Sequence, residues 1–329
     1  MDFGTTLGNA LREGFGGQAA FFALLAIGLN VHFGYTGLLN FGQIGFALVG
    51  AYGVGVGVVI FGWPLWAGIL LGLLAGVGLA LLLGLPTLRL RGDYFAIVTI
   101  AVAEVLRLIF RSNSLTDLTG GPFGLQNIAG EFAELNPFTN SFTIFGTWTY
   151  LPSQLWSGLV SWAAVLACTG LVFLLMRSPW GRILKGIRED EDAVRSLGKN
   201  AFFYKMQSLI LGGVIGSLAG VMLVLQTSTV NDVSFLPRQT FFAYAILIIG
   251  GAATTWGPVL GTMIFWFMFT FLSSLLRDLD MNDLLPGFLA GADKIGAVAF
   301  ATVGLTLMLL IIFRPQGILG DRRELLLDA

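Results

Sequence analysis

The residues best suited to act on another molecule form one short charged connection between two long apolar runs. Residues 182–198 read RILKGIREDEDAVRSLG, with apolar side chains at helical spacing and charged side chains between them. Pro179, shortly before this stretch, suits a helix start, and Gly198 suits a helix end. We therefore predict a short amphipathic helical segment, a pattern that docks in grooves on other proteins.

The apolar residues of this segment fall on two faces, one formed by Ile183, Leu184 and Ile187 and the other by Val194 and Leu197. A helix lying on anionic membrane lipid is the alternative interpretation. Residues 189–192 are all acidic, however, whereas lipid-bound helices favour Lys and Arg on their polar face. The pattern therefore favours a protein partner.

Neutral polar residues interrupt the apolar runs at two places, one in each half of the chain. Asn40 and Gln43 follow a glycine-rich turn, and Thr254 and Thr255 lie in the broken stretch 250–258. Unwound backbone at membrane depth is tolerated only against protein or a water-filled cavity. In secondary transporters such paired breaks point to the transport pathway, and by analogy these four residues are candidate pathway residues. The alternative is that Asn40 and Gln43, three residues apart, only bond neighbouring helices.

Charged residues inside the apolar runs are few. Glu104 and Arg107 are three residues apart, so they can pair on one helix face and lower the cost of burying both charges. We expect a structural pair, near the end of a span where a long side chain can reach the membrane surface. His32 is expected to be a polar residue at the membrane interface rather than a ligand.

Composition excludes several kinds of site. One histidine and one cysteine give no basis for a metal site, a disulfide framework or histidine catalysis, so we expect no metal, cofactor or catalytic residue. The 18 basic and 19 acidic residues leave a net charge of −1, which argues against nucleic acid. No GxxxxGK[ST] motif occurs, so ATP-driven work would need an ATPase on a separate chain.

The chain is 56% hydrophobic and only 11% charged, whereas soluble domains carry about 25% charged residues. This composition predicts an all-α integral membrane protein, a polytopic helical bundle of about eight spans with broken or re-entrant segments. The predicted spans lie near residues 18–33, 38–61, 65–85, 94–111, 155–176, 206–226, 241–276 and 288–313. The stretch 241–276 is too long for one pass, so we predict a broken hairpin that enters the membrane and returns.

Charge orients the predicted spans. The connection 177–205 carries seven Lys and Arg residues, whereas 112–154 carries three acidic residues and no basic one. The positive-inside rule places the first connection and the C-terminal tail in the cytoplasm and the second outside. The side of the N-terminus depends on whether 38–61 crosses fully (outside) or is re-entrant (inside). The opening residues lack a positively charged region before a cleavage site, so we expect no removable signal peptide. We expect the chain to form a single transmembrane domain, residues 1–329.

Glycines recur every fourth residue in two of the predicted spans. The positions are Gly68, Gly72 and Gly76 in one span and Gly212, Gly216 and Gly220 in the other. Small residues at this spacing let helix backbones approach closely. We expect them to pack helices within the chain, the alternative being a seam against a second membrane subunit.

Several short motifs, in this order, resemble the permease subunits of branched-chain amino acid ABC importers, specifically the LivM type. The resemblance runs from about residue 20 to residue 319. Its most specific pieces are GYTGLL (34–39), RLRGDYFAIVT (89–99), TGGP (119–122) with GL (124–125), SPWGR (178–182), IREDE (187–191), GG (250–251) with GPVLG (257–261), and FRPQG (313–317).

The resemblance implies a subunit in the bacterial inner membrane that moves branched-chain amino acids into the cytoplasm. Its implied partners are a homologous LivH-type permease, two cytoplasmic ABC ATPases and a periplasmic substrate-binding protein, which the loop 112–154 would help to receive. Related permeases serve urea and short amides, which are the alternative substrates.

The resemblance also gives the charged segment a role, because 182–198 is similar to the ATPase-docking EAA loop of importer permeases. It departs from that loop in having Glu191-Asp192-Ala193 in place of Glu-Ala-Ala and in placing Gly198 one residue late. The implied ATPase-coupling residues are Arg182, Ile183, Lys185, Ile187, Arg188, Glu189, Asp190, Glu191, Ala193 and Gly198.

Two other classes of membrane protein are alternatives to the importer permease. An ion-coupled secondary transporter would carry an intramembrane Asp, Glu or His as its ion site, and only Glu104 stands clearly inside a span, with Arg107 beside it. A membrane-embedded enzyme would need a nucleophile and base, for which no motif is present. The sequence therefore favours the importer permease.

Overall fold

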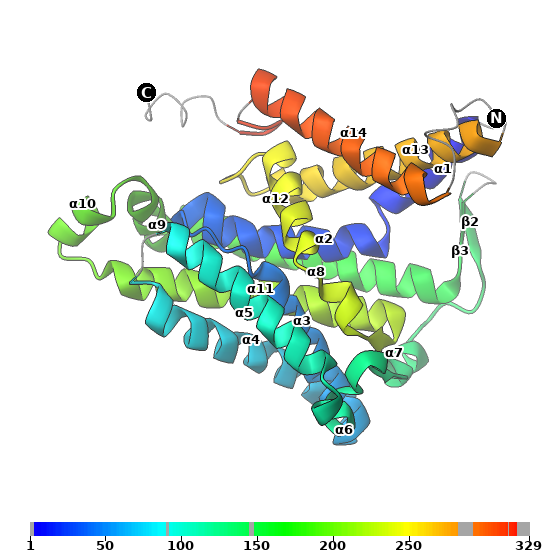
Figure 1. The fold of residues 1–329 in the computed structure, drawn as a ribbon, viewed down its shortest axis with the longest axis horizontal. Coiled ribbons are helices and arrows are strands. Elements are labelled where there is room, and N and C mark those ends of the chain that lie inside the picture. Colours follow the sequence, from blue (N-terminus) through cyan, green and yellow to red (C-terminus); the bar gives the residue numbers. More distant parts are fainter. Residues whose placement is uncertain (1–2, 90–91, 145–147, 282–291, 315, 321–329) are drawn as a thin grey trace.

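The computed structural model describes residues 3–89, 92–144, 148–281, 292–314 and 316–320 (Figure 1). The longer helices are α1 (Phe3–Gly14), α2 (Gly17–Leu29), α3 (Gln43–Gly55), α4 (Leu65–Thr87), α5 (Gly92–Arg111), α8 (Pro152–Arg177), α9 (Pro179–Glu189), α11 (Ala201–Thr227), α12 (Arg238–Gly250), α13 (Gly257–Met281) and α14 (Ala292–Phe313). Short helices are α6 (Thr116–Thr119), α7 (Gly130–Glu134) and α10 (Glu191–Ser196), with 3-10 turns η3 (Asn113–Leu115), η4 (Gly121–Phe123) and η5 (Asp232–Phe235). The π-helical stretches η1 (Asn30–Tyr35) and η2 (Val56–Ile60) extend α2 and α3.

The prediction of a polytopic all-α membrane protein is confirmed. Within the described residues, six helices are long and apolar enough to cross a membrane: α2 with η1, α3 with η2, α4, α8, α11 and α13. Together with α5 and α14 they account for the eight predicted spans. The start of the last predicted span, 288–291, lies outside the described residues.

The predicted stretch 241–276 forms a hairpin. Its arms are the 13-residue α12 and the 25-residue α13, so the second arm is a full-length helix. The arms run antiparallel, because Gly261 lies against the carbonyl of Ile246 and Gly250 lies against the carbonyl of Gly257. The glycines permit this approach, since a Cβ at either position would overlap the facing backbone. The break and the hairpin predicted from the sequence are therefore confirmed, as two antiparallel helices joined by a turn.

The centre of the bundle is α11, which packs against α2, α3 and α4. Its glycines face those helices: Gly212 lies against Gly28, Gly216 against Gln43 and Phe46, and Gly220 against the carbonyl of Ala47. The second glycine set, on α4, faces inward as well, with Gly68 against Val54, Gly72 against Gly50 and Gly76 against Ser217. Both sets therefore pack helices within the chain, as expected.

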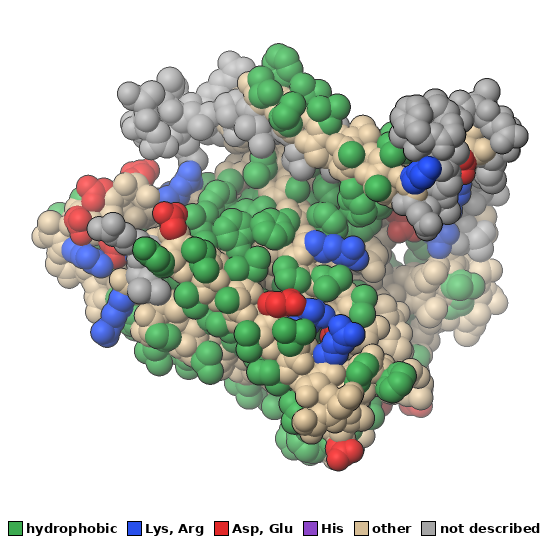
Figure 2. Space-filling view, in the orientation of Figure 1, with side chains coloured by type: hydrophobic (Ala, Val, Ile, Leu, Met, Phe, Trp, Pro, Cys, Tyr) green, Lys and Arg blue, Asp and Glu red, His purple; other side chains and the backbone are tan. Residues whose placement is uncertain are grey.

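The bundle has two distinct ends, one of which carries the charged connection. Helices α9 and α10 and the start of α11 form what we call the basic end, which contains the connection 177–205 (Figure 1). At the opposite end α8 begins, α11 ends, and strand β1 (Leu125–Gln126) pairs with β4 (Thr229–Val230). A hairpin of β2 (Phe142–Ile144) and β3 (Trp148–Tyr150) also lies there. In Figure 2, apolar side chains predominate over α4 and the first part of α5, while charged side chains gather around α9 and α10 and also appear over the end of α5.

The amino-terminal helix α1 is an element that the hydropathy pattern did not predict. It packs along α13, with Gly14 against Met263 and the Thr6 hydroxyl donating to Asp278 Oδ2 at 3.2 Å. Arg12 near its end donates to Gln154 Oε1 at the start of α8, at 2.8 Å. Helix α1 therefore lies at the end of the bundle opposite the basic end.

Candidate functional site

Helix α9 is the first half of the charged segment and is held against the bundle along one side. Pro179 occupies its first turn, where a missing N–H costs nothing. Leu184 and Ile187 are buried, and the Trp180 indole N–H donates to Gln207 Oε1 on α11 at 2.8 Å. The apolar face predicted for this part of the segment thus packs on α8 and α11.

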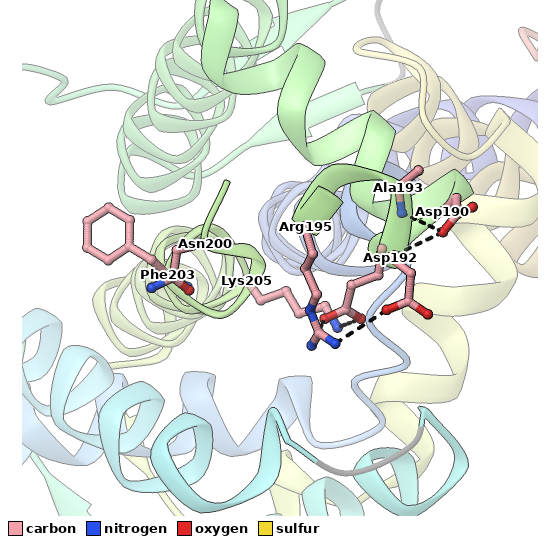
Figure 3. Close-up of polar contacts among 8 residues, drawn as sticks. Asp190, Asp192, Ala193, Arg195, Asn200, Phe203 and Lys205 are labelled. Atoms are coloured by element: carbon pink, nitrogen blue, oxygen red, sulfur yellow. Dashed lines mark hydrogen bonds and ion pairs between the residues drawn. The ribbon is translucent and has the colours of Figure 1, made fainter. Parts of the chain in front are cut away.

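The second half of the segment is a separate helix, α10. The backbone is extended at Asp190, whose carboxylate accepts from the N–H groups of Asp192 and Ala193 at 2.9 and 3.0 Å and so caps α10 (Figure 3). A side chain that caps a new helix at this point ends the previous one. The segment predicted as one helix is therefore two helices joined at Asp190.

Glu191 joins α10 to α11. Its Oε1 atom accepts from Arg195 Nη2 at 2.6 Å, and its Oε2 atom accepts from Lys205 Nζ on α11. Figure 3 shows Arg195 and Lys205 converging from their two helices. In addition, Val194 packs with Ile187 and Ala201, and this apolar contact attaches α10 to both α9 and α11.

The remaining predicted coupling residues mostly face outward. Exposed positions are Arg182, Lys185, Arg188, Glu189, Asp190 and Ala193, with Ile183 half-buried. Gly198 has a φ of +74°, the left-handed conformation that favours glycine after a helix end. The prediction that Leu197 shares a face with Val194 is wrong, because α10 ends at Ser196 and Leu197 projects with 79% of its surface exposed.

The charged segment touches the bundle core through η1. Arg188 Nη1 donates to the carbonyl of Gly34 at 2.7 Å, and Lys185 Nζ lies 5.9 Å from the centre of the Tyr35 ring. A π-helix leaves backbone carbonyls without their usual intrahelical partners and often marks a functional position. These two contacts attach α9 to the end of the first span.

Asn40 and Gln43 lie in a fully buried hydrogen-bond network with His32. The Asn40 amide nitrogen donates to Gln43 Oε1 and contacts His32 Nδ1, both at 3.0 Å. Gln43 Nε2 donates to the carbonyl of Gly212 at 3.0 Å, and His32 Nε2 contacts the carbonyl of Leu209 at 3.1 Å. Because a carbonyl can only accept, His32 carries its proton on Nε2 and accepts on Nδ1. The network joins η1, the start of α3 and α11.

Thr254 belongs to a second polar cluster, also attached to η1. The Asn30 side chain accepts from Ala253 N–H at 2.9 Å and donates to the carbonyl of Thr254 at 2.8 Å. Thr254 Oγ1 donates to the carbonyl of Gly251 and accepts from Gly257 N–H, so it shapes the turn between α12 and α13. Thr255 lies half-buried in the same turn. The structure thus places Asn40 beside Gln43 in one cluster and Thr254 and Thr255 in another. His32 of η1 contacts the first cluster, and Asn30 of η1 bonds the turn that carries the second.

Sequence reasoning missed the two residues that hold these clusters. His32 was expected at the membrane interface, but its side chain is fully buried, which corrects that expectation. No role was predicted for Asn30. The sequence signal that could have identified both residues is their position, because Asn30 and His32 are polar residues two apart near the end of an otherwise apolar run.

The Glu104–Arg107 pair is confirmed, and it has a third member. Arg107 donates from Nε and Nη2 to the two carboxylate oxygens of Glu104 at 2.9 and 2.6 Å. Its Nη1 donates at 2.6 Å to Asp232, which is buried in η5. Asp232 lies 125 residues away, so spacing could not reveal it. Removing Arg107 would leave a buried carboxylate unpaired, a loss of about 3–5 kcal/mol, so this cluster holds α5 to η5.

Comparison with known proteins assigns the family. The model of the family described as branched-chain amino acid transport system / permease component matches residues 13–290. The LivM high-affinity branched-chain amino acid transport system permease protein of Salmonella typhimurium is 30% identical over 316 residues, covering 92% of this chain and 68% of that protein. The probable LivM permease protein of Methanocaldococcus jannaschii is 25% identical, covering 91% and 90%. The nucleoside ABC transporter permease protein NupC of Lactococcus lactis is 25% identical, covering 73% of each chain.

These matches extend over the helices that carry both polar clusters and the charged segment. The chain therefore belongs to the branched-chain amino acid transport system permease family, as a multi-pass membrane protein of the LivM type.

Proposed function

We propose that this chain is one of the membrane-spanning subunits of an ATP-driven importer of branched-chain amino acids. The observation that carries the proposal is the family match over residues 13–290, which includes the whole charged segment. The absence of a GxxxxGK[ST] motif from the sequence supports ATP hydrolysis on separate chains. The partners would be a LivH-type permease, two ABC ATPases and a substrate-binding protein outside the membrane.

We place the basic end in the cytoplasm of a bacterial cell, because the seven basic residues of 177–205 lie there. The loop 112–154 then faces outward and is available to a binding protein. Since residues 17–35 and 43–60 both have the length and hydropathy of spans, helix α1 lies on the outer side. The tail after α14 returns to the cytoplasmic side.

The ATPase would dock on the exposed side of α9 and α10. The exposed basic residues Arg182 and Lys185, the acidic Glu189 and the projecting Leu197 offer both charge and an apolar contact. Motion would pass from Arg188 to Gly34, and from η1 through His32 and Asn30 to the two polar clusters. This chain of contacts links the docking segment to both broken segments of the membrane domain.

The substrate would pass near Asn40, Gln43, Thr254 and Thr255 when the clusters open. An amino acid is zwitterionic with no net charge, and neutral amide and hydroxyl groups can replace the water bonded to it without an unpaired buried charge. In the structure the amides of Asn40 and Gln43 are engaged in hydrogen bonds within the protein. Opening of η1 would free them.

Alanine at all four pathway positions is expected to lower ATP-driven leucine uptake at least tenfold and to alter selectivity among leucine, isoleucine and valine. Uptake is normalised to protein that elutes as a single folded species and melts cooperatively. The matched control replaces Thr169 and Thr262, buried threonines that bond only carbonyls of their own helices, and should retain uptake. Unchanged rate and selectivity in the fourfold variant would contradict the proposed pathway.

The assembly is tested by purifying the chain from native membranes in mild detergent and identifying the accompanying proteins by mass spectrometry. A second permease and two ATPases with Walker motifs are expected in fixed ratio. Recovery of the chain alone, able to move substrate on an ion gradient without ATP, would refute the importer and favour secondary transport.

A further inference from the structure

A cavity of about 400 Å³ lies between the end of α1, the start of α8 and the end of α11, at the end of the bundle that the proposed orientation places outside. This volume is within the roughly 300–1,000 Å³ range of small-molecule sites. It is separate from the polar clusters around η1, and nothing in the proposed coupling path uses it. Its lining combines charged, amide and aromatic side chains.

Two opposite charges line this cavity side by side. Arg12 donates to the neutral amide of Gln154 at 2.8 Å, and its guanidinium lies 5.1 Å over the Tyr150 ring. Glu13 follows it in the last turn of α1 and lines the same cavity. Within the part of the chain that the structure describes, no carboxylate pairs with Arg12 and no cation pairs with Glu13. Both residues are partly exposed, so water or a ligand can reach the two charges.

The rest of the lining includes both apolar and polar residues. Phe15 and Trp162 lie with ring centroids 6.4 Å apart, and the Trp162 indole N–H is already donated to the carbonyl of Phe15, which leaves an apolar ring face. Leu155 and Leu159 from α8 add further apolar side chains to the lining. Gly158 leaves open space on α8, since nothing lies within 4 Å of where its Cβ would be.

We propose that this cavity binds a zwitterion with an apolar substituent, its anionic group on Arg12, its ammonium group on Glu13 and its apolar part against Phe15 and Trp162. A free aliphatic amino acid has this chemistry, and so does the headgroup of phosphatidylethanolamine with the start of its chains. The amino-acid version rests on the proposed function, for which it supplies an outer reception site before the membrane pathway.

The test measures binding of L-leucine, leucinamide and 4-methylpentanoate to the intact complex in phosphatidylglycerol nanodiscs, which contain no ammonium lipid. Leucinamide lacks the carboxylate, and 4-methylpentanoate lacks the ammonium group. Wild-type protein should prefer leucine to each by about tenfold, as expected for a hydrogen bond to a charged group. Arg12→Gln should abolish the preference over leucinamide alone, and Glu13→Gln should abolish the preference over 4-methylpentanoate alone.

Arg12→Lys keeps the charge and should restore part of the first preference, which a merely structural role would not do. Arg111→Gln is the control, because Arg111 is an exposed arginine of α5 that does not line the cavity. In a second arm the nanodiscs contain phosphatidylethanolamine, and native mass spectrometry measures how much lipid stays bound. Lipid retention that falls in both charge variants, without leucine binding, would support the site with the lipid as its zwitterion.

Preferences and lipid retention that are unchanged in Arg12→Gln and Glu13→Gln would overturn the site. Such a result with normal ATP-driven leucine uptake would leave the proposed function intact. Conversely, charge-dependent binding in a complex that transports no amino acid would uphold the site and refute the proposed function.

Discussion

Glu191→Lys is expected to reduce ATP-driven amino-acid uptake at least tenfold while the ATPases continue to hydrolyse ATP. In the native protein Glu191 accepts from Arg195 and from Lys205, and so attaches α10 to α11. A lysine there would place three positive charges together and remove the ionic contact between α10 and α11, leaving only the apolar contacts of Val194. Because the apolar contacts of Leu184 and Ile187 do not depend on Glu191, the membrane domain should still fold.

Uptake into proteoliposomes and ATP hydrolysis, measured on the same preparation, check this prediction. The matched control is the exchanged pair, Glu191→Lys with Lys205→Glu, which restores opposite charges between α10 and α11. Recovery of uptake in the exchanged pair would assign the loss to that contact, and continued loss would assign it to contact of Glu191 with the ATPase. Gly198→Val should act in the same direction, since a φ of +74° is strained for a β-branched residue. Normal uptake in both Glu191→Lys and Gly198→Val would refute the coupling role.

Gly72→Leu is expected to prevent stable folding, whereas Gly78→Leu, six residues further along α4, should be tolerated. A Cβ at Gly72 would collide with the carbonyl of Gly50 on α3, where both sides of the contact are backbone. Overpacking a well-packed contact costs about 1–3 kcal/mol even where side chains can adjust, and backbone cannot adjust in that way. Gly78 has nothing within 4 Å of its Cβ position and is exposed.

Thermal unfolding in detergent and the yield of monodisperse protein test this pair of substitutions. We expect Gly72→Leu to lose at least about 3 kcal/mol of stability and most of its yield. Gly78→Leu should melt at or above the native temperature, because leucine is the better helix former. Equal stability of the two variants would mean that α3 and α4 do not pack as described.

Hydropathy and glycine spacing predicted much of this fold because both are local signals. The length of each apolar run located the spans, and the interruption at residues 250–258 located the turn between α12 and α13. The glycine spacing on α4 and α11 predicted internal packing, which the close approaches of Gly72 and Gly220 confirm. Each of these patterns lies within the sequence of a single helix or turn, so it can be recognised without knowing which helices contact one another.

The parts that could not be predicted depend on contacts between distant residues or on backbone detail. Asp232 joins Arg107 across 125 residues, and Asn30 joins Ala253 across 223. The break at Asp190 depends on a carboxylate turning back to cap α10, which competes with continued helix in a run of acidic residues. The π-helical end of the first span leaves no sequence pattern, yet it positions both Asn30 and His32.

The contacts between the charged segment and the two polar clusters suit the proposed coupling. Arg188 connects α9 to a carbonyl of η1, and the same short π-helix carries Asn30 and His32. A displacement of α9 would thus reach the α12–α13 turn and the start of α3 together. Coupling in this account needs no long-range strain, only a change in how η1 is bonded.

ATP-driven uptake of leucine by the purified complex in proteoliposomes distinguishes an importer subunit from a secondary transporter. We predict uptake that requires the second permease, the ATPases and ATP together, and that persists when ion gradients are dissipated. Isoleucine and valine should compete with leucine, whereas urea and short amides should not. Uptake by this chain alone on an ion gradient, or competition by urea in place of isoleucine and valine, would contradict it.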